Sequence, residues 1–136
     1  MLESAFRAAV LNKLPRAVHR QPMLAGMMGT AGTPDTYLDH KRDLWVEWKV
    51  LPREDHLPQV VPAKSMPTDI QREWLNRRFA AGGNAIVIVG VKLRGRAHGF
   101  VLESPPEWST PPLVEHYSKL LCTAADLAAY IQRRVS

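Results

Sequence analysis

The spacing of apolar residues predicts three helical segments. Over residues 2–14 apolar side chains recur four apart, which is typical of an amphipathic helix, and Pro15 is expected to end it. A second helix is predicted to start at the cap residue Thr68 and to stop at Gly82-Gly83. Residues 113–134 are Ala-rich and predict one or two further helices. The apolar side of the first helix contains Leu2, Phe6, Val10 and Leu14, and that of the second contains Ile70, Trp74, Leu75 and Phe79.

Between these helices the pattern changes to that of strands. Residues 36–40 and 43–50 predict a hairpin, because the second segment alternates strictly between two kinds of side chain. Residues 84–91 are continuously apolar and β-branched, which predicts a strand buried on both faces, and 96–103 predicts the next one. A strand over 17–24 is expected at a sheet edge because it contains Pro22. The order helix, three strands, helix, two strands, helix favours a mixed sheet flanked by helices.

Three segments have no such period and are expected to be loops. Residues 26–35 contain three glycines but lack the Gly-Lys-Ser/Thr ending of a phosphate-binding loop. Residues 51–67 carry four prolines, and an irregular segment of this length is often functional. Residues 104–112 are expected to form an extended proline-rich connector.

The alternation over 43–50 separates two faces of one strand. The side chains of Leu44, Val46, Trp48 and Val50 are expected to face the core. Trp45, Glu47 and Lys49 then project from the opposite face. An acid and a lysine two residues apart on one face of a strand are therefore candidates for chemistry.

Length and composition are typical of one folded domain. The chain has 136 residues, of which 46% are hydrophobic and 23% charged. We expect a single domain over 1–136, with a core over about 2–103 and a C-terminal helical extension over about 112–134. No secretory signal is apparent, and the longest apolar run, 85–91, is too short to cross a bilayer. These features favour a cytoplasmic protein without membrane contact.

Charge and cysteine content narrow the function classes. Lys and Arg number 18 against 13 Asp and Glu, a net charge of +5 that is compatible with a polyanionic partner. The single cysteine, Cys122, is expected in an apolar helix and excludes an internal disulfide. The five histidines lack zinc-ligand spacing, so a zinc site is not expected.

Pro34-Asp35, followed downstream by Glu47-Trp48-Lys49, resembles the PD-(D/E)XK nuclease signature. In that superfamily the Asp begins one strand of a hairpin and the E-x-K lies on the next. An acid on the first helix belongs to the pattern, and Glu3 occupies that place. A helix carrying Gln71 and then Trp74 resembles the VRR-NUC and phage Holliday-junction-resolvase branches. The resemblance spans about residues 3–91. An isolated D…E-x-K recurs by chance, and these further features make the pattern more specific.

The resemblance implies a restriction-endonuclease-like α/β fold and a Mg²⁺-dependent endodeoxyribonuclease. Mg²⁺ prefers oxygen ligands, and a divalent ion assists phosphodiester hydrolysis. By resemblance, Asp35, Glu47 and the main-chain carbonyl of Trp48 hold the metal, and Glu3 contributes directly or through water. Lys49 positions the attacking water, and Gln71 supports the site. Mn²⁺ is expected to substitute for Mg²⁺.

Each candidate also has a purely structural interpretation. Glu47 and Lys49 suit a solvated strand face, and Asp35 suits a turn. Glu3 suits the first turn of a helix, or an ion pair with Arg7 four residues on. Gln71 completes a capping box with the residue at 68. Trp45 suits packing beside a substrate or under a helix.

Six basic side chains are candidates for phosphate contacts, with solvated surface positions as the alternative. They are Arg72, Arg77, Arg78, Lys92, Arg94 and Arg96. The resemblance favours branched DNA as substrate, a homodimer and a phage origin. The alternatives are a nickase, a flap or single-strand endonuclease, a non-catalytic DNA-binding module and an interaction or packaging protein.

Overall fold

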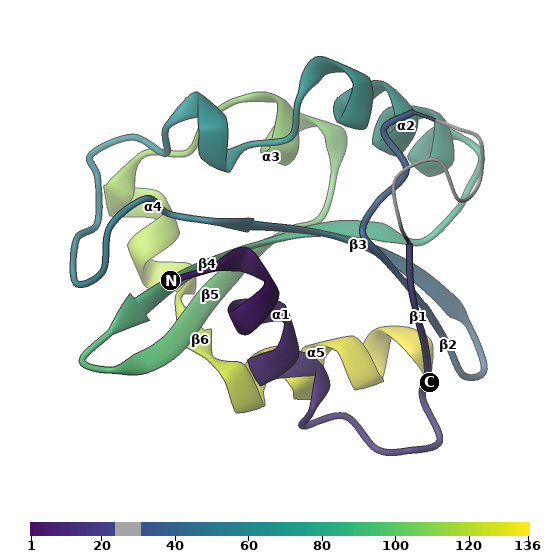
Figure 1. The fold of residues 1–136 in the computed structure, drawn as a ribbon. Coiled ribbons are helices and arrows are strands. Elements are labelled where there is room, and N and C mark those ends of the chain that lie inside the picture. Colours follow the sequence, from purple (N-terminus) through teal and green to yellow (C-terminus); the bar gives the residue numbers. More distant parts are fainter. Residues whose placement is uncertain (24–30) are drawn as a thin grey trace.

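A six-stranded mixed sheet forms the middle layer of the computed structural model, which describes residues 1–23 and 31–136 (Figure 1). The strands lie side by side in sequence order. Only β3 and β4 are parallel, and the other neighbours are antiparallel. The elements are α1 (Glu3–Leu11), β1 (His19–Pro22), β2 (Thr36–Asp39), β3 (Asp43–Val50), η1 (Ala63–Ser65), α2 (Asp69–Ala80), β4 (Ala85–Leu93), β5 (Arg96–Leu102), α3 (Pro105–Ser109), α4 (Val114–Tyr117), η2 (Ser118–Leu120), β6 (Cys122–Thr123) and α5 (Ala124–Val135).

Helices cover both faces of this sheet, as Figure 1 shows, with α1 and α5 on one face and α2, α3 and α4 on the other. Phe6 of α1 and Leu127 of α5 belong to the first core, and Trp108 of α3 and Tyr117 of α4 belong to the second. The predicted mixed sheet flanked by helices is confirmed. Among the described helices, none has both the length and the apolar character needed to cross a membrane.

The two central strands follow the predicted patterns. In β3, Val46 and Trp48 are buried in the α1/α5 core, whereas Trp45 packs against the core on the other face. In β4 the side chains alternate between the two cores, with Ile88 in the first and Val87 in the second. Both faces of β4 are therefore covered by a core, which explains its continuous apolar sequence.

The first helix is shorter than predicted. α1 ends at Leu11, whereas the apolar spacing predicted a helix as far as residue 14. The guanidinium of Arg20 donates to the carbonyls of Leu11, Leu14 and Pro15, so it satisfies acceptors that the end of the helix and the following turn leave free. Leu2, expected on the apolar side, is 74% exposed.

The proline-rich and C-terminal segments differ from the prediction. The expected extended connector over 104–112 contains the short helix α3, which starts at Pro105, and proline is tolerated in the first turn of a helix. Cys122 lies in strand β6, and the predicted helix there is wrong. Residues 112–134 are not simply a helical extension, because β6 pairs with β5 and α5 packs into the core. The expected glycine loop over 26–35 falls partly outside the described residues.

The predicted apolar side of the second helix is only partly buried. α2 starts at the cap Thr68 as predicted, but Leu75 is its one fully buried side chain within the described residues. Ile70 is 55% and Phe79 44% exposed. The ring of Trp74 meets that of Trp45 with centroids 5.1 Å apart, so α2 contacts the sheet through a narrow stripe.

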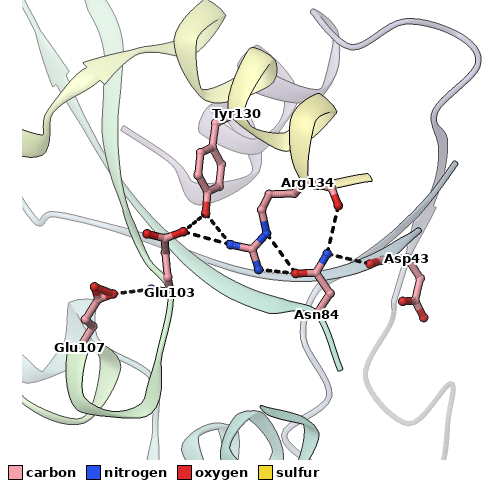
Figure 2. Close-up of polar contacts among 6 residues, drawn as sticks. All are labelled: Asp43, Asn84, Glu103, Glu107, Tyr130 and Arg134. Carbon is pink, nitrogen blue, oxygen red and sulfur yellow. Dashed lines mark hydrogen bonds and ion pairs between the residues drawn. The ribbon is translucent and has the colours of Figure 1, made fainter. Parts of the chain in front are cut away.

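A polar network ties α5 to the ends of β3, β4 and β5 (Figure 2). Arg134 donates from Nε to Asn84 Oδ1 at 3.1 Å and from Nη1 to Glu103 Oε2 at 3.1 Å. The Asn84 side chain in turn donates to the main-chain carbonyls of Asp43 at 3.0 Å and Arg134 at 3.2 Å. The Tyr130 hydroxyl lies between Arg134 and Glu103, and burial raises its pKa. The network fixes the end of the sheet at which β3 and β4 begin.

We expect Gly90→Ala to destabilise the protein by about 1–3 kcal/mol, the usual cost of overpacking a core. A Cβ atom at Gly90 would lie 2.4 Å from the ring of Phe6, which packs on this face of the sheet. Denaturant titration of the single variant and of Gly90→Ala/Phe6→Leu measures the effect. The smaller residue at position 6 should restore part of the lost stability, and equal destabilisation of both variants would contradict the packing account.

Candidate active site

The β2–β3 hairpin brings Asp35 next to Glu47. Thr36 pairs with Val46 in the antiparallel register, so Asp35 and Glu47 come next along the two strands. The Asp35 carboxylate accepts a hydrogen bond of 3.4 Å from the backbone N–H of Trp48, while its main-chain carbonyl accepts one of 2.7 Å from Met23. Asp35 is therefore held by hydrogen bonds on both sides, which a free turn residue would not be.

Glu47 is buried, so the interpretation as a solvated strand face is wrong for this residue. Its side chain is 1% exposed, because β3 lies between β2 and β4 beneath a helical layer. Burial raises the pKa of Glu47 to about 10, with further contributions from a hydrogen bond to Asp35 and from the Asp35 charge. In the metal-free protein at neutral pH the Glu47 carboxyl therefore carries a proton.

Glu3 and Lys49 complete this group of charges. Burial and the Asp35 carboxylate raise the pKa of Glu3, while Lys49 and then Arg7 lower it. Lys49 also lowers the pKa of Glu47, and Glu3 raises it. The charges of Glu3, Asp35, Glu47 and Lys49 therefore act on one another, and the Arg7 charge also acts on Glu3, as the alternative interpretation of Glu3 expected. We call these four side chains the carboxylate cluster.

The donor set suits a hard cation, although it is small. The Oε1 atom of Glu47 is buried and has no hydrogen-bond partner among the described residues, and such an atom favours a ligand. Asp35 and Glu47 are in direct contact, within reach of one shared ion. In the ranges that the structure describes, no three His, Cys, Asp or Glu side chains are arranged around a common metal position. Mg²⁺ commonly uses one or two protein carboxylates and keeps several waters, so the two carboxyl groups fit it.

Aromatic rings cover one side of the hairpin. Trp45 lies between Tyr37, with ring centroids 4.8 Å apart, and Trp74 of α2, at 5.1 Å. Of the two interpretations of Trp45, the structure favours packing under a helix. Gly32, with φ of 82°, approaches α2 so closely that a Cβ atom would lie 2.5 Å from the Ile70 carbonyl oxygen. The segment leading to Asp35 is therefore positioned against the start of α2.

Gln71 forms the capping box that its structural interpretation expected. The Gln71 Oε1 atom accepts from the Thr68 backbone at 2.9 Å, and the Thr68 hydroxyl accepts from the Gln71 backbone at 3.3 Å. This capping box stabilises the first turn of α2. The position of Gln71 follows from helix capping alone, so any role in the chemistry remains a prediction.

The six basic candidates are spread over different parts of the fold, with Arg72 near the start of α2. Arg77 and Arg78 are in the last turn of α2, whereas Lys92, Arg94 and Arg96 surround the β4–β5 turn. Four of the six pair with acids: Arg72 with Asp69, Arg77 with Glu73 at 3.7 Å, Arg78 with Asp43 at 3.2 Å and Lys92 with Glu54 at 3.9 Å. Ion pairs near the surface contribute little to stability.

One supporting residue has no sequence signal. Thr36 is 1% exposed and its hydroxyl accepts a hydrogen bond of 3.0 Å from the indole N–H of Trp48. The bond fixes Trp48, the residue between Glu47 and Lys49. A threonine is common at the start of a strand, so the sequence gives no sign of this contact. Only the pairing of β2 with β3 shows that Thr36 supports Trp48.

Comparisons with known proteins support the architecture. No family model matches the chain, and no curated protein matches it. A solved structure, that of Hjc from Archaeoglobus fulgidus, matches with a TM-score of 0.54 and 16% sequence identity over 94% of this chain and 96% of that one. Hjc is a Holliday junction resolvase from an archaeal hyperthermophile.

The fold is similar to that of a Holliday junction resolvase. At 16% identity this likeness concerns the fold alone. The predicted mixed α/β architecture is confirmed, whereas the resemblance to the PD-(D/E)XK superfamily and to its VRR-NUC and phage branches stays a prediction.

Proposed function

We propose that this protein is a Mg²⁺-dependent endonuclease that cuts branched DNA. The observation that carries the proposal is the carboxylate cluster, in which residues from α1, the start of β2 and β3 meet around a buried acid. A buried carboxyl with a strongly raised pKa and an unpartnered oxygen is costly for stability, and such costs concentrate at functional sites. The resolvase-like fold supports the choice of branched DNA.

Asp35 and Glu47 are the side chains that hold the metal in this proposal, together with the main-chain carbonyl of Trp48. When bound, Mg²⁺ supplies positive charge at the phosphate and a water nucleophile near neutral pH. Metal ligands must be deprotonated, so Glu47 has to release its proton as the ion enters. Glu3 lies on a separate element and contributes directly or through water.

Lys49 acts on the reacting groups from the same strand as Glu47. Its ammonium lowers the pKa of both Glu47 and Glu3, so it favours the ionised form of the cluster. We assign it two tasks: to orient the attacking water and to offset negative charge as it develops on the phosphate. Gln71 supports the site through the first turn of α2. Mn²⁺ is expected to replace Mg²⁺.

The six basic side chains hold the DNA backbone, and two copies of the chain place symmetric cuts across a junction. Backbone contacts give affinity without reading sequence, which suits an enzyme that recognises DNA shape. A homodimer follows from the need for two cuts, because each carboxylate cluster serves one strand. The protein is expected to act in the cytoplasm, and a phage origin is part of the same hypothesis.

A cleavage panel tests the proposal. Purified protein is incubated with linear, nicked, flap and four-way DNA, in Mg²⁺ or in EDTA, beside Asp35→Asn. The matched control is Glu115→Gln, an exposed acid on α4 remote in sequence from the cluster. We expect cutting of four-way DNA only with Mg²⁺, lost in Asp35→Asn and kept in the control. If the wild type binds DNA without cutting it, the result would instead support a non-catalytic DNA-binding module. If it neither binds nor cuts DNA, an interaction or packaging protein is the remaining alternative.

A further inference from the structure

A polar hollow lies at the end of the sheet where β3 and β4 begin. It is formed by the β2–β3 turn at Lys41–Asp43, by Arg78 near the end of α2, and by the Gly82–Asn84 link into β4. The network of Figure 2 lies beside it, because Asn84 donates to the Asp43 carbonyl and bonds Arg134. We call this feature the hairpin hollow.

The side chains of the hairpin hollow are mostly cationic. Lys41, Arg42 and Arg78 face a single acid, Asp43, which already pairs with Arg78 at 3.2 Å. Lys41 and Arg42 are exposed, and neither has an ion pair with an acid within the described ranges. Two positive charges are therefore left without a partner at this position, which favours an anionic ligand.

The hollow is also held in shape. The backbone N–H groups of Lys41 and Arg42 both donate to the Val135 carbonyl at 3.0 Å, so the C-terminal end of α5 fixes the turn. Gly83 leaves room for Arg78, since a Cβ atom there would lie 2.4 Å from Arg78 Nε. That Nε is buried and has no acceptor in the described part of the chain. Cations on a fixed turn lose little freedom when they bind a phosphate.

The distance between the hairpin hollow and the carboxylate cluster suits a DNA duplex. Asp43 and Glu47 are four residues apart on one strand, which corresponds to about 13 Å. The major groove of B-DNA is about 12 Å wide. A phosphate at the hollow and a phosphate at the cluster can therefore belong to backbones on the two sides of one groove.

We propose that the hairpin hollow is a second phosphate-binding site, which holds the DNA backbone one groove away from the bond that is cut. This inference rests on the proposed function and adds Lys41 and Arg42 to the DNA-contacting residues. Because the hollow lies away from the carboxylate cluster, it contributes to affinity and orientation and not to the chemical step.

The test compares two double variants with the same loss of charge. Lys41→Ala/Arg42→Ala removes the turn cations, and Lys13→Ala/Lys119→Ala removes two exposed lysines elsewhere, of which Lys13 lies near Ala97 and Thr123 at the β5–β6 side. Binding of four-way DNA in EDTA is measured as a function of salt. We expect the turn variant to bind about tenfold more weakly, with a salt slope smaller by about 1–2, and the control to bind like the wild type. Equal effects in both variants would overturn the proposal.

The outcomes separate this inference from the proposed function. If the wild type cuts DNA and the turn variant binds like the control, the hollow is not a phosphate site but the nuclease stands. If the wild type binds without cutting and only the turn variant is weakened, the hollow stands and the nuclease does not. Failure of the wild type to bind any DNA overturns both. Thermal melts of the two double variants check that each remains folded.

Discussion

Replacing Lys49 with methionine is expected to slow cleavage of four-way DNA by about 10²–10⁴-fold, the range for loss of one positioned catalytic group. Methionine keeps the length of the side chain but removes the ammonium that lies beside Glu47 and Glu3. Single-turnover kinetics at saturating DNA isolate the chemical step from binding. DNA affinity should change little, because one cation among many backbone contacts is lost.

The control for this prediction is Lys119→Met, which removes the same charge from the exposed η2 turn. It should cut at the wild-type rate. Loss of the Lys49 ammonium also raises the pKa of Glu47 and Glu3 further, since the lysine lowers both in the wild type. Saturation of Lys49→Met with Mn²⁺ should therefore require a higher pH. A variant that cuts as fast as the wild type would remove Lys49 from the mechanism.

Glu47→Gln is expected to make the metal-free protein more stable at neutral and alkaline pH. The pKa of Glu47 is raised from its ordinary value of 4.5 to about 10 by burial and by Asp35. Between these values the unfolded carboxyl is ionised while the folded one keeps its proton, so folding takes up a proton. The stability of the wild type therefore falls as pH rises through this window, by at most about 1.4 kcal/mol per pH unit.

Glutamine imitates the protonated acid, because its amide can donate to Asp35 and carries no ionisable proton. We expect Glu47→Gln in EDTA to gain at most about 3 kcal/mol near pH 7, or about 10 °C in Tm, with the advantage growing toward pH 9. Mg²⁺ should raise the Tm of the wild type by mass action but leave that of the variant unchanged. The control is Glu73→Gln, which alters an exposed acid paired with Arg77. A Glu47→Gln protein that is less stable than the wild type in EDTA at pH 8 would contradict the raised pKa of the Glu47 carboxyl.

Much of the central architecture follows from local sequence patterns. The alternation over 43–50 predicted which β3 side chains enter the core, and the apolar run over 84–91 predicted a strand covered on both faces. Both patterns are strong because one or both faces of these strands are buried, so each position must match its environment. The cap at Thr68 and the stop at Gly82-Gly83 likewise marked the ends of α2.

The sequence-based predictions were wrong at positions where tertiary contacts decide the local structure. α1 ends at Leu11, and the free carbonyls of Leu11 and Leu14 accept hydrogen bonds from Arg20, a contact that the apolar spacing does not reveal. β6 has two residues and exists only because β5 offers an open edge, so no periodicity can reveal it. Ile70 and Phe79 fit an amphipathic pattern but remain largely exposed, since α2 meets the sheet along a narrow stripe.

The functional roles of the candidate site residues stay predictions, and the environment of these residues did not follow from the sequence. Spacing and resemblance named Glu3, Asp35, Glu47 and Lys49, and the charges of these residues act on one another in the structure. Sequence could not distinguish a buried Glu47 from a solvated one, because alternation gives the face of a strand but not what covers it. Sequence also could not predict where the basic residues lie relative to one another. Their positions, including those of Lys41 and Arg42, depend on the parallel pairing of β3 with β4.

The most direct measurement of the central claim is the position of manganese in crystals soaked with Mn²⁺, located by its anomalous scattering. We expect an ion between the carboxylates of Asp35 and Glu47, close to the main-chain carbonyl of Trp48, and no ion there in crystals of Asp35→Asn. Wild-type crystals in which the fold is intact, Mn²⁺ is in excess and no anomalous peak lies at the carboxylate cluster would contradict the central claim.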